Sequence, residues 1–191
     1  NFEKAVLAYF NVSDFFYTNS GTDALFLILK AMELKEGDEI ILPSYVCESV
    51  WYAVLKAGLK PVLTDIGDNW VATEKEITDK ITPKTKAIIA VYTFGLPCDI
   101  ENITKLGIPV IEDVCQSVGL EINGKKAGTF GVASFTSFNA IKCLTTGGEG
   151  GGVITDNQEI AEKIKRMKSQ YFYTGGITEI QAAVGLAQME Q

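Results

Sequence analysis

Short apolar runs bounded by turn residues alternate along this chain with segments of helical periodicity. Strands that are joined through helices in this way usually pair in parallel, since each helix carries the chain back across the sheet. We therefore predict an α/β domain with a mostly parallel central sheet and helices on both faces. The predicted strands span 15–18, 39–42, 61–64, 87–92, 110–112, 133–138 and 152–155, and the predicted helices span 22–34, 73–81, 158–168 and 178–190.

Length and charge limit the kind of protein that this domain can be. The 191 residues are 47% hydrophobic, which is enough for one compact domain with a substantial core. A net charge of -7 gives no basic surface for a nucleic-acid backbone. No apolar run approaches the roughly 20 residues that span a bilayer, and the N-terminus lacks a secretory pattern. We expect a cytoplasmic protein with neither nucleic-acid nor membrane partners.

Two scarce residue types narrow the chemistry further. Histidine is absent, which excludes Ser-His-Asp hydrolysis, Cys-His proteolysis and His-rich zinc sites. Proton transfer must then use Lys, Asp, Glu, Tyr or Cys. The single arginine, Arg166, lies in a Lys-rich helical segment, so a bidentate clamp for a substrate carboxylate is hard to place. The four cysteines form no Cys-x-x-Cys pair, and we predict free thiols.

Two glycine-rich segments invite a nucleotide-binding interpretation and fail its tests. Residues 119–126 have the glycine spacing of a P-loop but end on Lys126, where Ser or Thr is needed to bind magnesium. Residues 147–152 contain no Gly-x-Gly-x-x-Gly frame between a strand and a helix. Two interpretations of 147–152 stay open, a tight turn into the next strand or part of a cofactor loop.

Three other segments have the residue types of one active site. Ser20-Gly21-Thr22-Asp23 joins a strand to an apolar helix, whose first N–H groups can hold a phosphate. Asp113 ends a buried strand, at the edge where open α/β sheets bind ligands. Lys142 follows the next apolar strand, so its amine can enter the same crevice. Taken singly, the three have ordinary explanations as an N-cap, a strand-end carboxylate and a solvated lysine.

Together, and in this order, these sites resemble the sugar aminotransferase family named after DegT, DnrJ, EryC1 and StrS. The resemblance covers nearly the whole chain, with its most specific segments at 112–116, 137–146 and 178–183 and further ones at 20–22, 37–45, 82–87 and 95–99. It implies that residues 1–191 are the large domain of a fold-type I transferase, which binds pyridoxal 5'-phosphate. It also implies that the C-terminal small domain is absent from this chain, and that the protein is a homodimer with shared active sites.

The resemblance gives each matching residue a role. Lys142 would bind the cofactor covalently and then carry the proton between the substrate and cofactor carbons. Asp113 would pair with the pyridine nitrogen and keep it protonated, and Gln116 would hydrogen-bond the ring oxygen. The phosphate contacts would come from Thr22, the backbone N–H of Asp23 and the hydroxyl of Ser137.

This sequence departs from the family pattern at two places. Cys47 stands where members usually place an aromatic residue over the cofactor ring, which leaves Tyr45 and Trp51 as possible replacements. Thr174-Gly175-Gly176 stands where many members have an Asn-Tyr-Arg run that reaches the partner subunit's phosphate.

The function implied is transfer of an amino group from glutamate to a nucleotide-linked keto sugar, in cell-surface polysaccharide or amino-sugar biosynthesis. A related sugar dehydratase is one alternative, although that branch has histidine in place of the lysine. A binding or regulatory homologue without turnover is the other.

Overall fold

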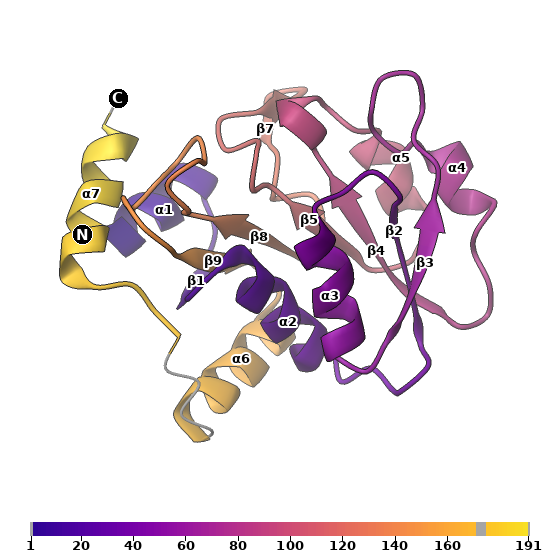
Figure 1. Cartoon of the computed structure of the whole chain (residues 1–191), viewed down its shortest axis with the longest axis horizontal. Coiled ribbons are helices and arrows are strands. Elements are labelled where there is room, and N and C mark those ends of the chain that lie inside the picture. Colours follow the sequence, from indigo (N-terminus) through magenta and orange to yellow (C-terminus); the bar gives the residue numbers. More distant parts are fainter. Residues whose placement is uncertain (1, 171–174, 191) are drawn as a thin grey trace.

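The computed structural model describes residues 2–170 and 175–190, and a central sheet crosses this part of the chain (Figure 1). The sheet has seven strands in the order β1-β9-β8-β5-β4-β2-β3. Its strands are β1 (Asp14–Thr18), β2 (Glu39–Pro43), β3 (Lys60–Thr64), β4 (Thr85–Val91), β5 (Val110–Asp113), β8 (Ala133–Ser137) and β9 (Gly151–Thr155). A separate hairpin joins β6 (Glu121–Ile122) to β7 (Lys125–Lys126).

Strand direction places several chain segments at one edge of the sheet. Strands β3, β2, β4, β5 and β8 run parallel, while β9 is antiparallel to both β8 and β1. The carboxyl ends of β4, β5 and β8 therefore lie side by side. The prediction of a mostly parallel sheet is confirmed.

Helices cover both faces of the sheet, as predicted. They are α1 (Phe2–Phe10), α2 (Gly21–Ala31), α3 (Glu48–Lys56), α4 (Glu74–Thr78), the 3-10 helix η1 (Thr93–Gly95), α5 (Ile100–Lys105), α6 (Gln158–Gln170) and α7 (Glu179–Met189). One buried cluster joins α2, α3 and α6 to one face of the sheet. The other joins α1, α4 and α5 to the opposite face, and α7 packs on α1.

The ends of three helices follow from local chemistry. The helix predicted at 22–34 ends earlier, at Ala31, because Glu33 adopts a left-handed backbone with φ of 52°. The helix predicted at 73–81 is only α4, which a capping box at Thr73 starts and which stops before Pro83. Asn157 caps α6, since its Oδ1 accepts the N–H of Ile160 at 3.1 Å.

The strand predicted at 133–138 ends one residue earlier, at Ser137. The N–H of Phe138 donates to the carbonyl of Gly150, and there the chain leaves the sheet for the loop that carries Lys142.

All four cysteines are free thiols, as predicted. Within the described ranges, none of the helices combines the length and apolar character needed to cross a bilayer.

A buried carboxylate fixes the segment that leads into β8. Glu112 on β5 is 0% exposed and accepts the N–H groups of Gly128, Phe130 and Gly131 at 2.7, 2.6 and 2.6 Å. The hydroxyl of Tyr92 donates to the same carboxylate. Burial raises the pKa of Glu112, and these hydrogen bonds oppose that shift.

Candidate active site

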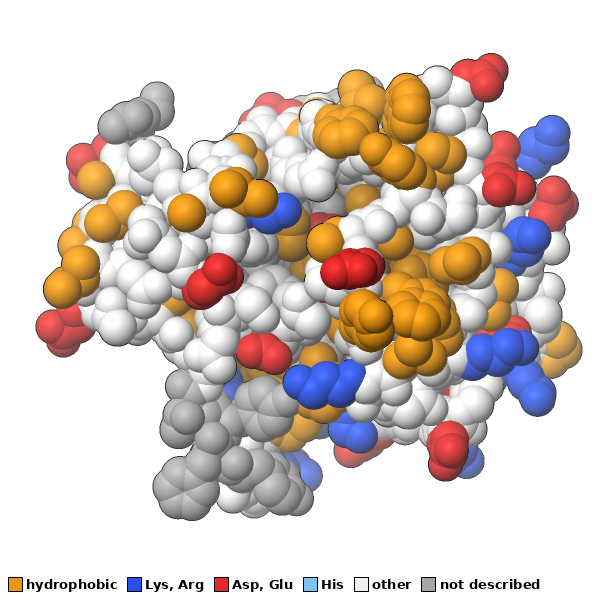
Figure 2. All heavy atoms as spheres, in the orientation of Figure 1, with side chains coloured by type: hydrophobic (Ala, Val, Ile, Leu, Met, Phe, Trp, Pro, Cys, Tyr) orange, Lys and Arg blue, Asp and Glu red, His pale blue; other side chains and the backbone are white. Residues whose placement is uncertain are grey.

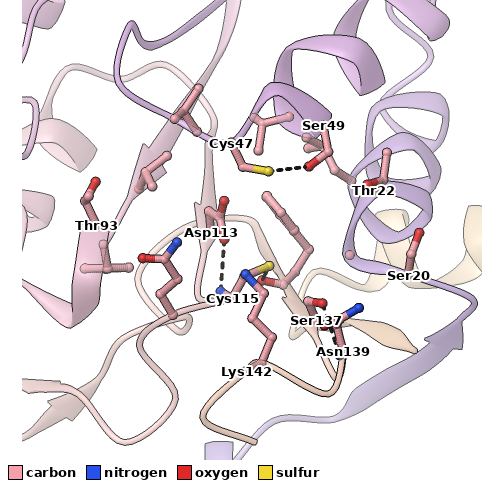
Figure 3. Close-up of a pocket in the computed structure, with 18 of the residues that line it drawn as sticks. Ser20, Thr22, Cys47, Ser49, Thr93, Asp113, Cys115, Ser137, Asn139 and Lys142 are labelled. Atoms are coloured by element: carbon pink, nitrogen blue, oxygen red, sulfur yellow. Dashed lines mark hydrogen bonds between the residues drawn. The ribbon is translucent and has the colours of Figure 1, made fainter. Parts of the chain in front are cut away.

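A cavity of about 540 Å³ opens at the carboxyl ends of β4, β5 and β8, next to the first turn of α2 (Figure 3). Five of the six residues that the resemblance implies line this cavity, namely Thr22, Asp113, Gln116, Ser137 and Lys142. Asp23 is not among the lining residues. The sheet topology thus brings together side chains that lie as many as 120 positions apart, since Thr22 is on α2 and Lys142 follows β8.

Asp113, the last residue of β5, is the buried carboxylate of the cavity. It is 7% exposed, and its Oδ1 accepts the N–H of Cys115 at 2.9 Å. Burial raises the pKa of Asp113, while the Cys115 hydrogen bonds and the positive charge of Lys142 act in the opposite direction. A cation bound in the cavity would further favour the ionised form of this carboxylate.

Lys142 lies on the loop between β8 and β9, and its side chain extends toward Cys115 and Asp113 (Figure 3). Burial raises the pKa of the Cys115 thiol well above its usual value, and the charge of Lys142 acts in the opposite direction. The amine therefore faces the carboxylate at the end of the neighbouring strand. A reacting group bound between them would contact both.

Asn139 holds the loop that carries Lys142. Its backbone carbonyl accepts the N–H of Lys142 at 2.9 Å, and its Oδ1 accepts the N–H of Ile141 at 3.1 Å. Its Nδ2 donates to Glu149 Oε1 at 2.6 Å, and Gln181 Nε2 on α7 donates to the Glu149 carbonyl at 2.6 Å. Sequence reasoning assigned no role to Asn139 or Glu149, although both lie in segments that it singled out. Residues 147–152 are thus partly a loop that supports Lys142.

The start of α2 faces the cavity with backbone N–H groups. Ser20 Oγ accepts the N–H of Asp23 at 3.1 Å, so the group that the resemblance assigns to a phosphate is occupied by the helix cap. The Asp23 carboxylate lies 3.9 Å from Lys56 Nζ. The N–H groups of Gly21 and Thr22 precede the first intrahelical bond, from Ala24 to Ser20, and are the ones available to a ligand.

Gly21 lets the start of α2 pack closely against the Cys115 segment and the end of β8. A Cβ at this position would lie 3.2 Å from Cys115 Sγ and 3.2 Å from Ser137 Cβ, closer than most side chains approach. The hydroxyl of Ser137 accepts the N–H of Asn139 at 3.4 Å. Helix α2, the Cys115 segment and the end of β8 thus converge on a small polar cradle.

Gln116 lies on the other side of the cavity. Its Oε1 accepts the N–H of Phe94 at 2.8 Å, so its Nε2 is the end of the amide that can donate to a ligand. Thr93, which sequence reasoning missed, also lines the cavity, and its buried hydroxyl has no hydrogen-bond partner among the described residues. Thr93 begins the short 3-10 helix η1 that follows β4, and an unpartnered threonine there has no sequence pattern that could have identified it.

Cys47 lines the cavity, where its Sγ accepts a hydrogen bond from Ser49 Oγ at 3.1 Å. Of the two aromatic residues that could replace a stacking ring, Tyr45 lines the cavity and Trp51 does not.

Arg166 is exposed on α6, and the cavity wall contains no arginine among the described residues. Thr174 lies outside the described residues, while the N–H of Gly176 donates to Asn19 Oδ1 at 3.2 Å.

The mostly parallel sheet, with a cavity at its carboxyl edge, gives this chain the fold of the fold-type I aminotransferases. Within that class the chain belongs to the DegT/DnrJ/EryC1/StrS aminotransferase family, whose model matches residues 1–191.

Individual relatives agree with this membership. A UDP-N-acetyl-3-dehydro-alpha-D-glucosamine 3-aminotransferase of Acidithiobacillus ferrooxidans is 42% identical over 155 residues, which are 78% of this chain and 42% of that protein. The X-ray structure of the aminotransferase from Psychrobacter cryohalolentis has a TM-score of 0.92 at 29% identity and covers 99% of this chain and 55% of its own. The structure of ntda from Bacillus subtilis with bound cofactor PMP has a TM-score of 0.85 at 32% identity. The match covers 99% of this chain and 47% of the ntda chain. The chain thus spans about half the length of these relatives.

Proposed function

We propose that residues 1–191 form the large domain of a pyridoxal-phosphate-dependent aminotransferase that moves an amino group from glutamate to a nucleotide-linked keto sugar. The observation that carries this proposal is the presence of Lys142 and the buried Asp113 in one cavity. The name of the Acidithiobacillus relative, which specifies an amino-group transfer to a UDP-linked sugar, supports the substrate class. We place the whole protein in the cytoplasm as a homodimer with shared active sites, in amino-sugar or cell-surface polysaccharide biosynthesis.

The cavity fits pyridoxal phosphate at both ends of that molecule. The cradle formed by the N–H groups of Gly21 and Thr22 and the hydroxyl of Ser137 suits a phosphate, and an added Cβ at Gly21 would press on Ser137. Asp113, buried and 7% exposed, suits a protonated ring nitrogen, and Gln116 Nε2 suits an acidic ring oxygen. Pyridoxal phosphate supplies, when bound, an electron sink for the carbon that loses a proton.

The residues of this chain supply binding and proton transfer. Lys142 is the group with both the reach and the chemistry to bind the cofactor covalently and to move a proton at the substrate carbon. Asn139 and Glu149 hold the backbone around Lys142, and so orient its amine. Asp113 would hold a proton at the ring nitrogen. The dehydratase alternative is disfavoured, because this chain has Lys142 and no histidine.

We expect Asp113→Asn to retain cofactor binding but to lose most of its turnover. A neutral amide cannot stabilise a protonated ring nitrogen, and a hydrogen bond to a charged group contributes on the order of 1.5–3 kcal/mol, which corresponds to roughly ten- to a hundredfold in rate. The measurement is kcat with saturating substrates, alongside cofactor titration of the same variant. Near-normal kcat would remove Asp113 from the mechanism.

The experiment that tests the function compares two acceptor classes with glutamate as the donor. We expect a far higher kcat/KM for a nucleotide-linked keto sugar than for oxaloacetate. The cavity offers no arginine fork among its described residues for a dicarboxylate, whereas a nucleotide supplies binding energy away from the reacting carbon. Preference for oxaloacetate would contradict the sugar assignment. If glutamate leaves the absorption of the bound cofactor unchanged, the protein is a binding homologue without turnover.

A further inference from the structure

Three aromatic side chains gather at the mouth of the cavity, outside the set assigned above to the cofactor. Tyr45, Trp70 and Phe94 are 44%, 51% and 63% exposed, and Tyr45 and Phe94 also line the cavity. The ring centroid of Tyr45 lies 5.3 Å from that of Trp70 and 6.1 Å from that of Phe94. Figure 2 shows apolar side chains gathered above the central hollow in this view. We call Tyr45, Trp70 and Phe94 the aromatic rim.

Two residues of the aromatic rim have unusual backbone conformations. Trp70 and Phe94 have φ angles of 66° and 55°, in the left-handed region that bulky residues rarely adopt. Residues in such conformations persist where the surrounding structure holds them, and they gather at ligand sites. The backbone N–H of Phe94 donates to Gln116 Oε1 at 2.8 Å, so one contact both holds the backbone that carries this ring and orients the Gln116 side chain. The fold therefore presents these rings to solvent at the entrance of the cavity.

The charges around the cavity favour a ligand that is recognised by an uncharged surface. Among the described residues of the cavity wall, Lys142 is the single cation, while the chain carries a net charge of -7. A diphosphate gains little electrostatic attraction in such surroundings. A nucleobase of any kind, in contrast, can stack on an aromatic side chain, because every base has a π-face.

We propose that the aromatic rim binds the base of a nucleoside diphosphate, so that the attached sugar enters the cavity that contains Lys142. This inference rests on the proposed function, which requires a nucleotide-linked substrate but does not say where its nucleotide binds. The aromatic rim becomes a determinant of substrate affinity, in addition to the six residues assigned to the cofactor.

The binding test uses the full chain without cofactor or glutamate, titrated by calorimetry with uridine diphosphate and with guanosine diphosphate. Trp70→Leu and Phe94→Leu should each weaken nucleotide binding on the order of ten- to a hundredfold, as expected for the loss of a stacked ring. Trp51→Leu is the matched control, since Trp51 is 36% exposed and does not line the cavity. Inorganic pyrophosphate, which has no base, should bind far more weakly. Unchanged affinity in both rim variants would overturn the proposal, as would pyrophosphate binding as tight as that of the nucleotides.

Tryptophan fluorescence gives an independent readout, because the chain has two tryptophans. Trp51→Phe leaves Trp70 as the sole reporter, and nucleotide should quench its emission. Trp70→Phe leaves Trp51, and nucleotide should then have no effect. Emission of Trp70 that stays constant at saturating nucleotide would contradict stacking on this ring. Circular dichroism melting of each variant checks that the fold is retained.

A second copy of this chain could cover the same surface, and sedimentation separates that outcome. If the rim variants change the association state and leave nucleotide affinity unaltered, the aromatic rim is an interface between copies and the proposal is wrong. The two proposals also fail separately. If the protein binds nucleotides through the aromatic rim but does not transaminate, only the proposed function is wrong. If it transaminates a sugar nucleotide and the rim variants do not change the affinity for that substrate, only this inference is wrong.

Discussion

Replacing Lys142 with arginine should abolish covalent cofactor attachment and reduce transamination by at least about 10²–10⁴-fold, the usual contribution of a positioned acid–base group. Arginine keeps the positive charge near Asp113 but stays protonated at all working pH values, so it can neither attack a carbonyl nor accept the substrate proton. The cavity keeps its phosphate cradle at Gly21 and Ser137 in this variant. We therefore expect noncovalent cofactor binding to persist while turnover disappears.

Borohydride reduction of the cofactor-bound protein, followed by peptide mapping, measures the attachment directly. The reduced pyridoxyl group should lie on the peptide that contains Lys142, and Lys142→Arg should carry none. Lys125→Arg is a suitable control, since Lys125 lies on the β6–β7 hairpin and is not part of the cavity wall. A pyridoxyl group found on Lys125 or on Lys126 would show that the assignment of Lys142 is wrong.

The sheet and its strand-end residues were predictable from the sequence because burial dictates both. Strands β2, β4 and β5 are buried along nearly their whole length, and each contains a short apolar run that marked it as a strand. A polar residue that ends such a run, such as Asp113, then lies at the sheet edge where ligands bind. Helix α1 was not predicted, although Phe2, Val6 and Phe10 recur every four residues along its buried face.

The contacts that complete the site were beyond the sequence because they depend on loop geometry. Asn139 meets Glu149 ten positions away only because the loop between them folds back beside Gly148. Phe94 reaches Gln116 through a left-handed backbone, which no apolar pattern encodes. The occupied N–H of Asp23 follows from the orientation of the Ser20 side chain in the cap. The residue types in the sequence thus indicated the chemistry of the site. The residues that hold the site residues in position could be identified only from the structure.

The largest loss of stability should follow from Glu112→Ala. Glu112 is 0% exposed, and its carboxylate accepts three backbone N–H groups of residues 128–131 as well as the hydroxyl of Tyr92. Burial, followed by the charge of Glu112, raises the pKa of Tyr92, so that hydroxyl stays protonated and donates. Truncation at Glu112 leaves two buried donors, the Tyr92 hydroxyl and the Gly128 N–H, and two partly buried N–H groups without their acceptor. Each unsatisfied buried group costs about 1–3 kcal/mol, and we expect a total on the order of 3–5 kcal/mol after partial relaxation.

Chemical denaturation followed by circular dichroism measures this loss as a change in the free energy of unfolding. The exposed Glu36→Ala is the matched control and should change that free energy by no more than about 0.5 kcal/mol. Glu112→Gln should be intermediate, because the amide keeps one acceptor oxygen but turns N–H donors toward the backbone N–H groups. A Glu112→Ala variant within about 1 kcal/mol of the parent protein would mean that water or a neighbouring group replaces the carboxylate. Tyr92 lines the cavity, and Asp113 follows Glu112 on the same strand. A large loss of stability in Glu112→Ala would therefore also mean that the hydrogen bonds of Glu112 hold the active-site edge of the sheet in place.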